Sequence, residues 1–199
     1  MEDKIKLCLF AGHCLKEPGA CCFGLREHDE AQKVVRFMIP AFKDEFDVIT
    51  FEADPDMTES ETLIKKVNII KEFNPKFSID FHLNAGGGTG VESIVHPDSS
   101  LIFSDMLNLA DSMNEAMTTL GLKNRGFKPA YYAGDPTKID YFVRKNPGNA
   151  FIFEMLFIDN VNDVRLLKNN EHMKIASTIV LGIQRVLNII KLDPQIRGE

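Results

Sequence analysis

The stretch Phe151-Ile152-Phe153-Glu154-Met155-Leu156-Phe157-Ile158 decides the fold class of this 199-residue chain. Apart from one residue it is apolar, which is typical of a strand buried on both faces in a sheet covered by helices. The exception is Glu154. A carboxylate inside a buried strand is costly unless it is paired, bound to a metal or protonated. Two interpretations are therefore open: a buried ion pair, or a catalytic base kept dry beside a metal.

Strand-like and helix-like segments alternate along the rest of the chain. Strands are predicted at residues 4–10, 47–52, 77–82 and 91–96, and helices at 27–42, 58–73, 101–120, 135–146 and 172–190. This alternation predicts a single α/β domain with a mostly parallel sheet covered by helices on both faces. We expect the domain to occupy residues 1–192 and a polar tail to occupy residues 193–199.

Charge and hydropathy narrow the choice of partners. The 23 basic and 29 acidic residues give a net charge of −6, which disfavours nucleic acid and anionic membranes as partners. No run of about 18 apolar residues is present, so no membrane-spanning segment is predicted. The first residues lack the features of a secretory signal. We therefore expect a protein made in the cytoplasm without a signal peptide, or a truncated form of a secreted one.

The four cysteines all lie near the start of the chain, at Cys8, Cys14, Cys21 and Cys22. A disulfide framework would spread its cysteines across the fold, so this clustering favours reduced thiols. A structural zinc site normally needs two spaced pairs of ligands, which the adjacent Cys21 and Cys22 do not provide. We expect the cysteines to be free and not needed for catalysis.

Three polar residues stand at the ends or beginnings of predicted elements. His13 follows the first strand, His82 ends the strand at 77–82, and Glu27 opens the first helix. Sites in open α/β sheets collect beyond the carboxyl ends of the strands. Taken singly, each histidine could be a hydrogen-bonded core or rim residue, and Glu27 a helix-start acid favoured by the helix dipole. Together, two histidines and one carboxylate form a known catalytic zinc set.

The other candidates have simpler interpretations. The remaining histidines, His28, His96 and His172, are interpreted as solvated or hydrogen-bonded. The glycine cluster at residues 86–90 has no following lysine and is not a P-loop, so we expect a flexible loop at the rim of the site. The HExxH, GxSxG and GxGxxG signatures are absent.

Seven short segments occur in a fixed order: AGH at 11–13, PGA at 18–20, GLRE at 24–27, DFHLNA at 80–85, GVE at 90–92, NRG at 124–126 and FEMLFIDN at 153–160. This ordered set resembles the zinc-dependent N-acetylmuramoyl-L-alanine amidases of the amidase-3 type. The resemblance extends from about Lys4 to about Ile190. It implies a twisted mixed sheet flanked by helices.

The resemblance also implies a site and an activity. The zinc ligands of the family fall on His13, Glu27 and His82, and its catalytic glutamate falls on Glu154. The implied activity is Zn²⁺-dependent hydrolysis of the amide between N-acetylmuramic acid and L-alanine, with peptidoglycan as the partner. A member without a leader resembles the catalytic domain of a bacteriolytic phage or prophage endolysin, which acts on the cell wall after its release. A mother-cell amidase of a spore-forming bacterium is the other leaderless type.

Some positions depart from the family pattern, and other functions remain open. Cys14 follows His13 where glycines are common, and its thiol could compete for the metal or be oxidised. Asp80 stands where a serine is common. Asn84 and Arg125 are suggested to orient substrate or loops. The alternative functions are a zinc peptidase that cuts another peptidoglycan amide and a non-catalytic wall-binding module, although a pure binder has no need of Glu154 in a buried strand.

Overall fold

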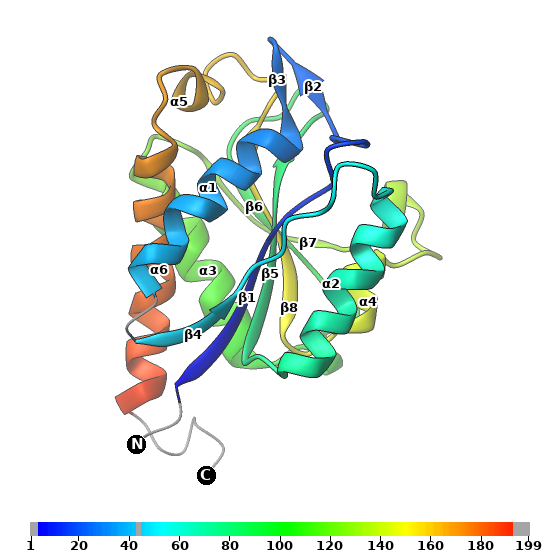
Figure 1. Ribbon diagram of the computed structural model, residues 1–199. Coiled ribbons are helices and arrows are strands. Elements are labelled where there is room, and N and C mark those ends of the chain that lie inside the picture. Colours follow the sequence, from blue (N-terminus) through cyan, green and yellow to red (C-terminus); the bar gives the residue numbers. More distant parts are fainter. Residues whose placement is uncertain (1–3, 43–44, 193–199) are drawn as a thin grey trace.

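The computed structural model describes residues 4–42 and 45–192 and places a six-stranded sheet between two layers of helices (Figure 1). The order across the sheet is β4-β1-β5-β8-β6-β7. The strands are β1 (Ile5–Ala11), β4 (Phe46–Ile49), β5 (Phe77–Asn84), β6 (Val91–Val95), β7 (Asn124–Pro129) and β8 (Ala150–Phe157). The predicted tail at 193–199 lies outside the described residues, so the domain boundary at residue 192 stays a prediction.

The sheet is mixed but mostly parallel. Strands β4, β1, β5 and β8 run in the same direction. Strand β6 is antiparallel to β8, and the edge strand β7 is parallel to β6. The predicted fold class, a single α/β domain with a mostly parallel mixed sheet, is confirmed. The carboxyl ends of β1 and β5 meet at one edge, where β1 leads to His13 and β5 carries His82.

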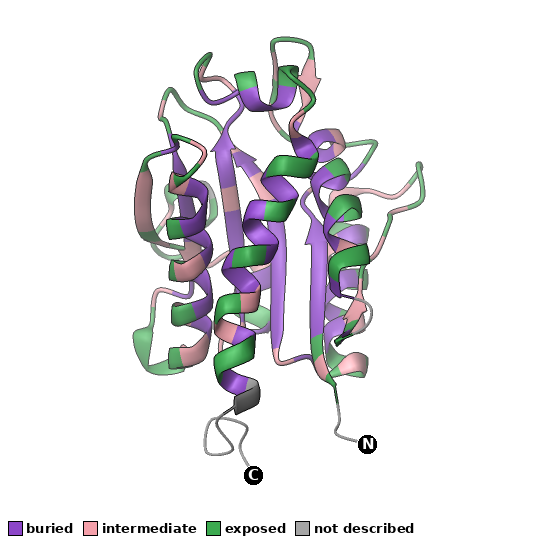
Figure 2. Cartoon of the chain, turned by 90° about the vertical axis from the view of Figure 1, so that its left-hand side faces the viewer, coloured by how far each residue is buried: buried purple, intermediate pink, exposed green. Residues whose placement is uncertain are grey.

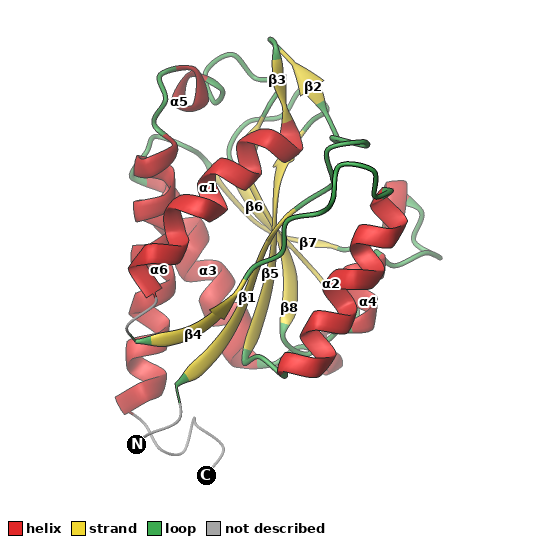
Figure 3. Ribbon diagram, in the orientation of Figure 1, coloured by secondary structure: helices red, strands yellow, loops and turns green. Residues whose placement is uncertain are grey.

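Helices cover both faces of the sheet (Figure 3). One layer contains α1 (Glu27–Phe42), α3 (Ser104–Thr118) and α6 (His172–Leu192), in which α6 packs against the other two. The opposite layer contains α2 (Glu59–Phe73) and α4 (Tyr141–Lys145). Each layer has its own apolar core against the sheet, so the central strands are buried on both sides (Figure 2). This explains the nearly continuous apolar run of β8.

Local sequence signals fix the start of α2. Thr58 is the N-cap residue, and its side chain accepts a hydrogen bond from the Glu61 backbone N–H while the Glu61 carboxylate accepts one from the Thr58 backbone N–H. This capping box satisfies two donors that the first turn would otherwise leave without partners. Asn74, in the left-handed conformation, ends the helix. The structure thus confirms the helix start predicted at Thr58.

Several parts of the secondary structure differ from the prediction. The helix expected at 135–146 is reduced to α4, which begins after the N-cap Asp140 and is preceded by a 3-10 turn, η2 (Tyr132–Gly134). Strand β7 was not predicted, because an edge strand with the sequence NRGFKP has no apolar alternation. A small hairpin of β2 (Cys21–Cys22) and β3 (Leu25–Arg26), a 3-10 turn η1 (Ser99–Leu101) and a short helix α5 (Arg165–Lys168) were also missed.

Helix α6 is long and apolar. By length and composition its segment His172–Ile190 could cross a membrane, with a mean hydropathy of 1.4, but half of that window is buried inside the protein. Its apolar side chains contribute to the core that α1 and α3 share. Packing inside the domain is therefore sufficient to explain its composition.

Candidate metal centre

His13 is held in place by the backbone where β1 ends. The Gly12 N–H donates to the Phe81 carbonyl oxygen at 2.8 Å, and His28 Nδ1 lies 2.7 Å from the Gly12 oxygen. His13 itself has a φ of 57°, the left-handed region that is costly for a residue with a side chain. A Cβ atom at Gly12 would lie 2.3 Å from the ring of His82, so only glycine allows this close approach.

Glu27 is the first residue of α1, yet its carboxylate is not solvated. The residue is 4% exposed. Its Oε2 accepts a hydrogen bond from the Ala20 N–H at 2.8 Å, and its Oε1 accepts one from the Leu83 N–H at 3.1 Å. These donors come from the loop before α1 and from the end of β5. Two distant backbone segments therefore fix the carboxylate, as expected of a site residue rather than of an ordinary helix-start acid.

The structure brings His13, Glu27 and His82 together. His13 Nε2 lies 3.2 Å from Glu27 Oε1, and His82 Nδ1 lies 2.9 Å from the same oxygen. One ligand atom from each residue lies within 4.8 Å of the others. Ligands at about 2.0–2.2 Å from a tetrahedral zinc ion are separated by about 3.3–3.6 Å, so the donor set fits one ion after small movements. The clustering predicted from the sequence is present, and the binding of a metal by these residues stays a proposal.

The residues of the cluster shift the pKa values of one another. Burial lowers the pKa of His13, but the carboxylates of Glu27 and Glu59 outweigh this effect and raise the pKa to about 9. Burial also opposes ionisation of Glu27, but the neighbouring His13 and His82 hold its pKa far below the usual range. A bound cation would take the place of these protons, because metal ligands must be deprotonated.

Glu154 lies beside the cluster, on β8. It is the register partner of His82 on β5 and of Glu92 on β6. The residue is partly exposed, but its Oε2 atom is buried and lacks a hydrogen-bond partner within the described part of the chain. Among those residues Glu154 forms no ion pair, which argues against the interpretation as a buried ion pair. Burial raises the pKa of Glu154 to about 7, which suits a general base.

Glu92 was not singled out from the sequence, although it lies next to Glu154. Its Oε1 accepts a hydrogen bond from Asn84 Nδ2 at 2.6 Å, and its Oε2 accepts one from Arg125 Nε at 2.5 Å. The Arg125 guanidinium also lies over the Phe157 ring, 4.9 Å from its centroid. Asn84 and Arg125 therefore hold Glu92 in this structure. In the sequence, Glu92 stood inside the predicted strand at 91–96 and in the GVE segment at 90–92, but neither position gave it a role.

Two further carboxylates lie near the ring nitrogens of His13 and His82 that point away from Glu27. Glu59, in the first turn of α2, lies 3.1 Å from His13 Nδ1, and Asp80 lies 3.5 Å from His82 Nε2. Sequence analysis did not assign either residue to the site. An acidic helix start at Glu59 looked like ordinary helix chemistry, and its proximity to His13 depends on how α2 packs.

The glycine-rich loop at 86–90 is more firmly held than the sequence suggested. Asp159 Oδ2 accepts hydrogen bonds from the Gly86 and Gly87 N–H groups, both at 2.8 Å. Asp163 Oδ2 accepts one from the Gly90 N–H at 2.8 Å. Asn160 donates to the Gly88 oxygen, also at 2.8 Å. Residues after β8 thus hold the backbone of this loop, which follows the end of β5 that carries His82.

All four cysteines are free thiols, as expected. Cys14, although next to His13, is buried and donates its thiol hydrogen to the Met57 oxygen at 3.2 Å. The metal-type cluster of the described residues contains only His13, Glu27 and His82. Cys14 is therefore engaged with the backbone in this structure.

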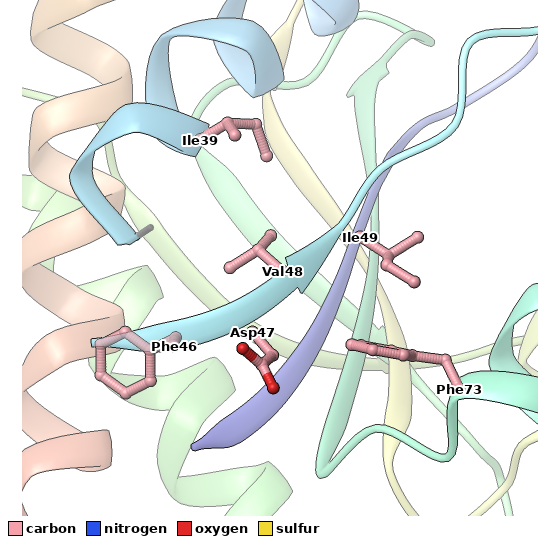
Figure 4. Close-up of a pocket in the computed structure, with 6 residues that line it drawn as sticks. All are labelled: Ile39, Phe46, Asp47, Val48, Ile49 and Phe73. Carbon is pink, nitrogen blue, oxygen red and sulfur yellow. The ribbon is translucent and has the colours of Figure 1, made fainter. Parts of the chain in front are cut away.

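A hollow of about 380 Å³ lies elsewhere, at the β4 edge of the sheet (Figure 4). Its lining is apolar except for Asp47 and comes from α1, β4 and the end of α2: Ile39, Phe46, Asp47, Val48, Ile49 and Phe73. It contains none of the residues of the cluster, and Asp47 is the one ionisable residue in its lining.

Comparison with known proteins gives matches that cover most of the chain. The profile of a family described as N-acetylmuramoyl-L-alanine amidase matches residues 7–185. A sporulation-specific N-acetylmuramoyl-L-alanine amidase of Bacillus subtilis is 23% identical over 188 residues, which are 94% of this chain and 70% of that protein. The endolysin of Bacillus phage SPP1 is 28% identical over 190 residues, 92% of this chain and 66% of the endolysin.

Solved structures show the same fold. The N-acetylmuramoyl-L-alanine amidase AmiC2 of Nostoc punctiforme superimposes with a TM-score of 0.74 at 19% identity, over 94% of this chain and 99% of that one. Cwp6 from Clostridium difficile gives a TM-score of 0.78 at 21% identity, over 94% of this chain but 30% of that much longer one.

Proposed function

The chain belongs to the N-acetylmuramoyl-L-alanine amidase family, and on this basis we propose that it hydrolyses the amide between N-acetylmuramic acid and L-alanine in peptidoglycan with a zinc ion as cofactor. The observation that carries the proposal is the cluster of His13, Glu27 and His82 next to Glu154, whose Oε2 has no partner in the described residues. The cluster provides a place for a metal, and Glu154 provides a group that accepts protons.

The donor set favours zinc in a catalytic rather than a structural site. Two imidazole nitrogens and one carboxylate oxygen suit zinc, and three protein ligands leave one position open. When bound, zinc would lower the pKa of a water molecule toward 7 and polarise the carbonyl of the substrate. His13, Glu27 and His82 would hold the ion, and the backbone donors to Glu27 would keep its carboxylate oriented.

Glu154 is proposed as the residue that moves the proton. Burial raises the pKa of Glu154, and in its ionised form the carboxylate can take a proton from the attacking water. The same carboxyl group then delivers the proton to the nitrogen of L-alanine as the amide bond breaks. Its Oε2 atom is buried and has no hydrogen-bond partner in the described residues, and its register partner is His82, so this oxygen is free to perform both transfers.

The alternative functions make different predictions. A zinc peptidase would use the same groups but cut an amide within the stem peptide. A non-catalytic wall-binding module would not need a general base, and the unpartnered oxygen of Glu154 therefore favours an enzyme. The relative that is named an endolysin supports a lytic role at the cell wall.

Digestion of purified peptidoglycan by the zinc-loaded protein, followed by mass spectrometry, tests the proposal. We expect free stem peptides that begin with L-alanine, and glycan strands that keep their lactyl groups. New amino termini should appear on L-alanine without new reducing sugar ends. Amino termini on any other residue would identify a peptidase, and an undigested wall would contradict an enzymatic role. Metal analysis should give about one zinc per chain, and His13→Ala should lower that content.

Replacing Glu154 with glutamine separates metal binding from proton transfer. We expect Glu154→Gln to retain zinc and to lose about 10²–10⁴-fold in turnover, because an amide side chain cannot act as a general base. Glu72→Gln, on the exposed surface of α2, is the matched control and should leave turnover unchanged. Near-normal turnover of Glu154→Gln would exclude the proposed role, whereas a loss of zinc would make Glu154 a ligand.

A further inference from the structure

A buried ion pair lies directly behind the metal centre. Lys66 of α2 and Asp80 of β5 are 1% and 2% exposed at their side chains, and Lys66 Nζ lies 2.7 Å from Asp80 Oδ1. Burying two charges costs more than their attraction returns unless the geometry is good, so such a pair is weak evidence for stability alone. The position of this pair at the site calls for a more specific explanation.

The ring of His82 lies between Asp80 and the cluster. Its Nδ1 lies 2.9 Å from Glu27 Oε1, whereas its Nε2 lies 3.5 Å from Asp80 Oδ2. The second distance is about 0.3 Å beyond the upper limit of an N–H···O hydrogen bond, so a small rotation of the ring would form one. A histidine that binds a metal usually donates its other N–H to a carboxylate or carbonyl, which fixes the tautomer and the orientation of the ring.

Lys66 links this arrangement to the other histidine. Its ammonium group donates to both oxygens of Asp80, at 2.7 and 3.0 Å, and to the Ala11 oxygen at 2.7 Å. An ammonium group has three donors, and Lys66 uses all of them. Ala11 ends β1, two residues before His13. One buried cation thus holds both the strand end that places His13 and the carboxylate behind His82.

We propose that Asp80 and Lys66 are positioning residues of the metal centre. Asp80 accepts the Nε2–H of His82, so that His82 binds the metal through Nδ1. Lys66 fixes Asp80 and the end of β1 at the same time. His13 presents the opposite nitrogen, Nε2, to the cluster and has Glu59 at its Nδ1, so the two histidines bind through different ring nitrogens. This inference rests on the proposed function, because it concerns ligands of its metal.

Two double variants test the role of the acceptor. Lys66→Met/Asp80→Leu removes both charges, so neither is left unpaired, and removes the acceptor. Lys66→Met/Asp80→Asn also removes both charges but keeps an oxygen that can accept from His82 Nε2–H. We expect the leucine variant to bind zinc about 10–100-fold more weakly than wild type in competition with a chromophoric chelator. The asparagine variant should recover most of this loss. A purely structural pair would not distinguish the two.

The control is Lys76→Met/Asp105→Leu, which removes an ion pair of 2.9 Å next to the opposite end of β5. It should leave the zinc affinity unchanged. Circular dichroism identifies any variant that fails to fold. Wild-type zinc affinity in a folded Lys66→Met/Asp80→Leu protein, or equal weakening in both Asp80 variants, would overturn the proposal.

A second measurement needs no variant. In the zinc-loaded wild-type protein, ¹⁵N imidazole shifts should show His82 protonated at Nε2 and bound through Nδ1, and His13 the reverse. Protonation of His82 at Nδ1 would overturn the proposal even if all variants misfold. If the wild-type chain binds no zinc at all, the proposed function fails instead, and the zinc content of the wild type distinguishes the two failures.

Discussion

Replacing Gly12 with alanine should weaken zinc binding without unfolding the domain. The added Cβ would lie 2.3 Å from the Cε1 and Nε2 atoms of His82 and 2.6 Å from its Cδ2, whereas ordinary contact begins at 3.4 Å. The ring must therefore move by about 1.1 Å or the end of β1 must shift. Neither movement is easy, because Glu27 and Asp80 lie at either side of the ring and Phe81 and His28 hold the Gly12 backbone.

The expected loss of zinc affinity follows from the small errors in ligand distance that a zinc site tolerates. Zinc–nitrogen bonds of about 2.0–2.1 Å tolerate errors of about 0.2 Å, so a displacement of about 1 Å removes His82 as an effective ligand. Changes to residues that merely support a ligand cost about 10–100-fold in affinity. Gly12→Ala acts on the ligand itself, and we expect a loss of about 100-fold or more, equivalent to about 3 kcal/mol.

Competition with a chromophoric chelator measures this loss, and circular dichroism checks the fold. The matched control is Gly148→Ala, whose Cβ would lie 2.7 Å from the Phe103 ring. Phe103 is 63% exposed and can move away, so this variant should bind zinc like wild type. If folded Gly12→Ala bound zinc with wild-type affinity, then either His82 is not a ligand or the close packing at Gly12 does not position it.

In the metal-free protein, the pKa of His13 is raised from 6.5 to about 9, so the folded state holds this proton more tightly than the unfolded state. The stability that this proton contributes is complete below pH 6.5 and is lost as the pH rises through about 9. Urea unfolding with a chelator present should show that the free energy of unfolding falls over this range. The His13→Gln variant should show a smaller fall. Thiol alkylation followed by mass spectrometry should modify the exposed Cys21 readily. Cys8 should react only after unfolding, because it is buried and burial raises its pKa to about 12; equal labelling of both thiols in the native protein would contradict the structure.

The parts of the site that follow strand ends could be predicted from the sequence. The apolar period of residues 27–42 predicts α1 with its observed bounds, which places Glu27 at the start of a helix. Alternation at 77–82 places His82 at the carboxyl end of β5. Because neighbouring parallel strands end at one edge of a sheet, these local patterns are sufficient to bring the predicted ligands together.

The supporting residues could not be predicted in this way. Lys66 is one of several lysines on α2, and only the packing of α2 on the sheet buries it beside Asp80. Glu59 and Glu92 likewise depend on contacts between elements distant in sequence. Strand β7 was missed because its pairing with β6, rather than its composition, makes it a strand. The positions of these residues and of β7 therefore depend on long-range packing, which local periodicity does not reveal.

The hydrogen bonds that Asp159, Asn160 and Asp163 make with the glycine-rich loop bear on the thermodynamics of substrate capture. Fixing the backbone of one residue costs about 1–2 kcal/mol in conformational entropy, and glycine loses more freedom than any other residue. Since folding has already met this cost at residues 86–90, a glycan strand that arrives at this rim would meet an ordered surface. Association would then require little ordering of the loop, and we expect the amide hydrogen exchange of Gly86, Gly87 and Gly90 to be similar before and after a muropeptide binds.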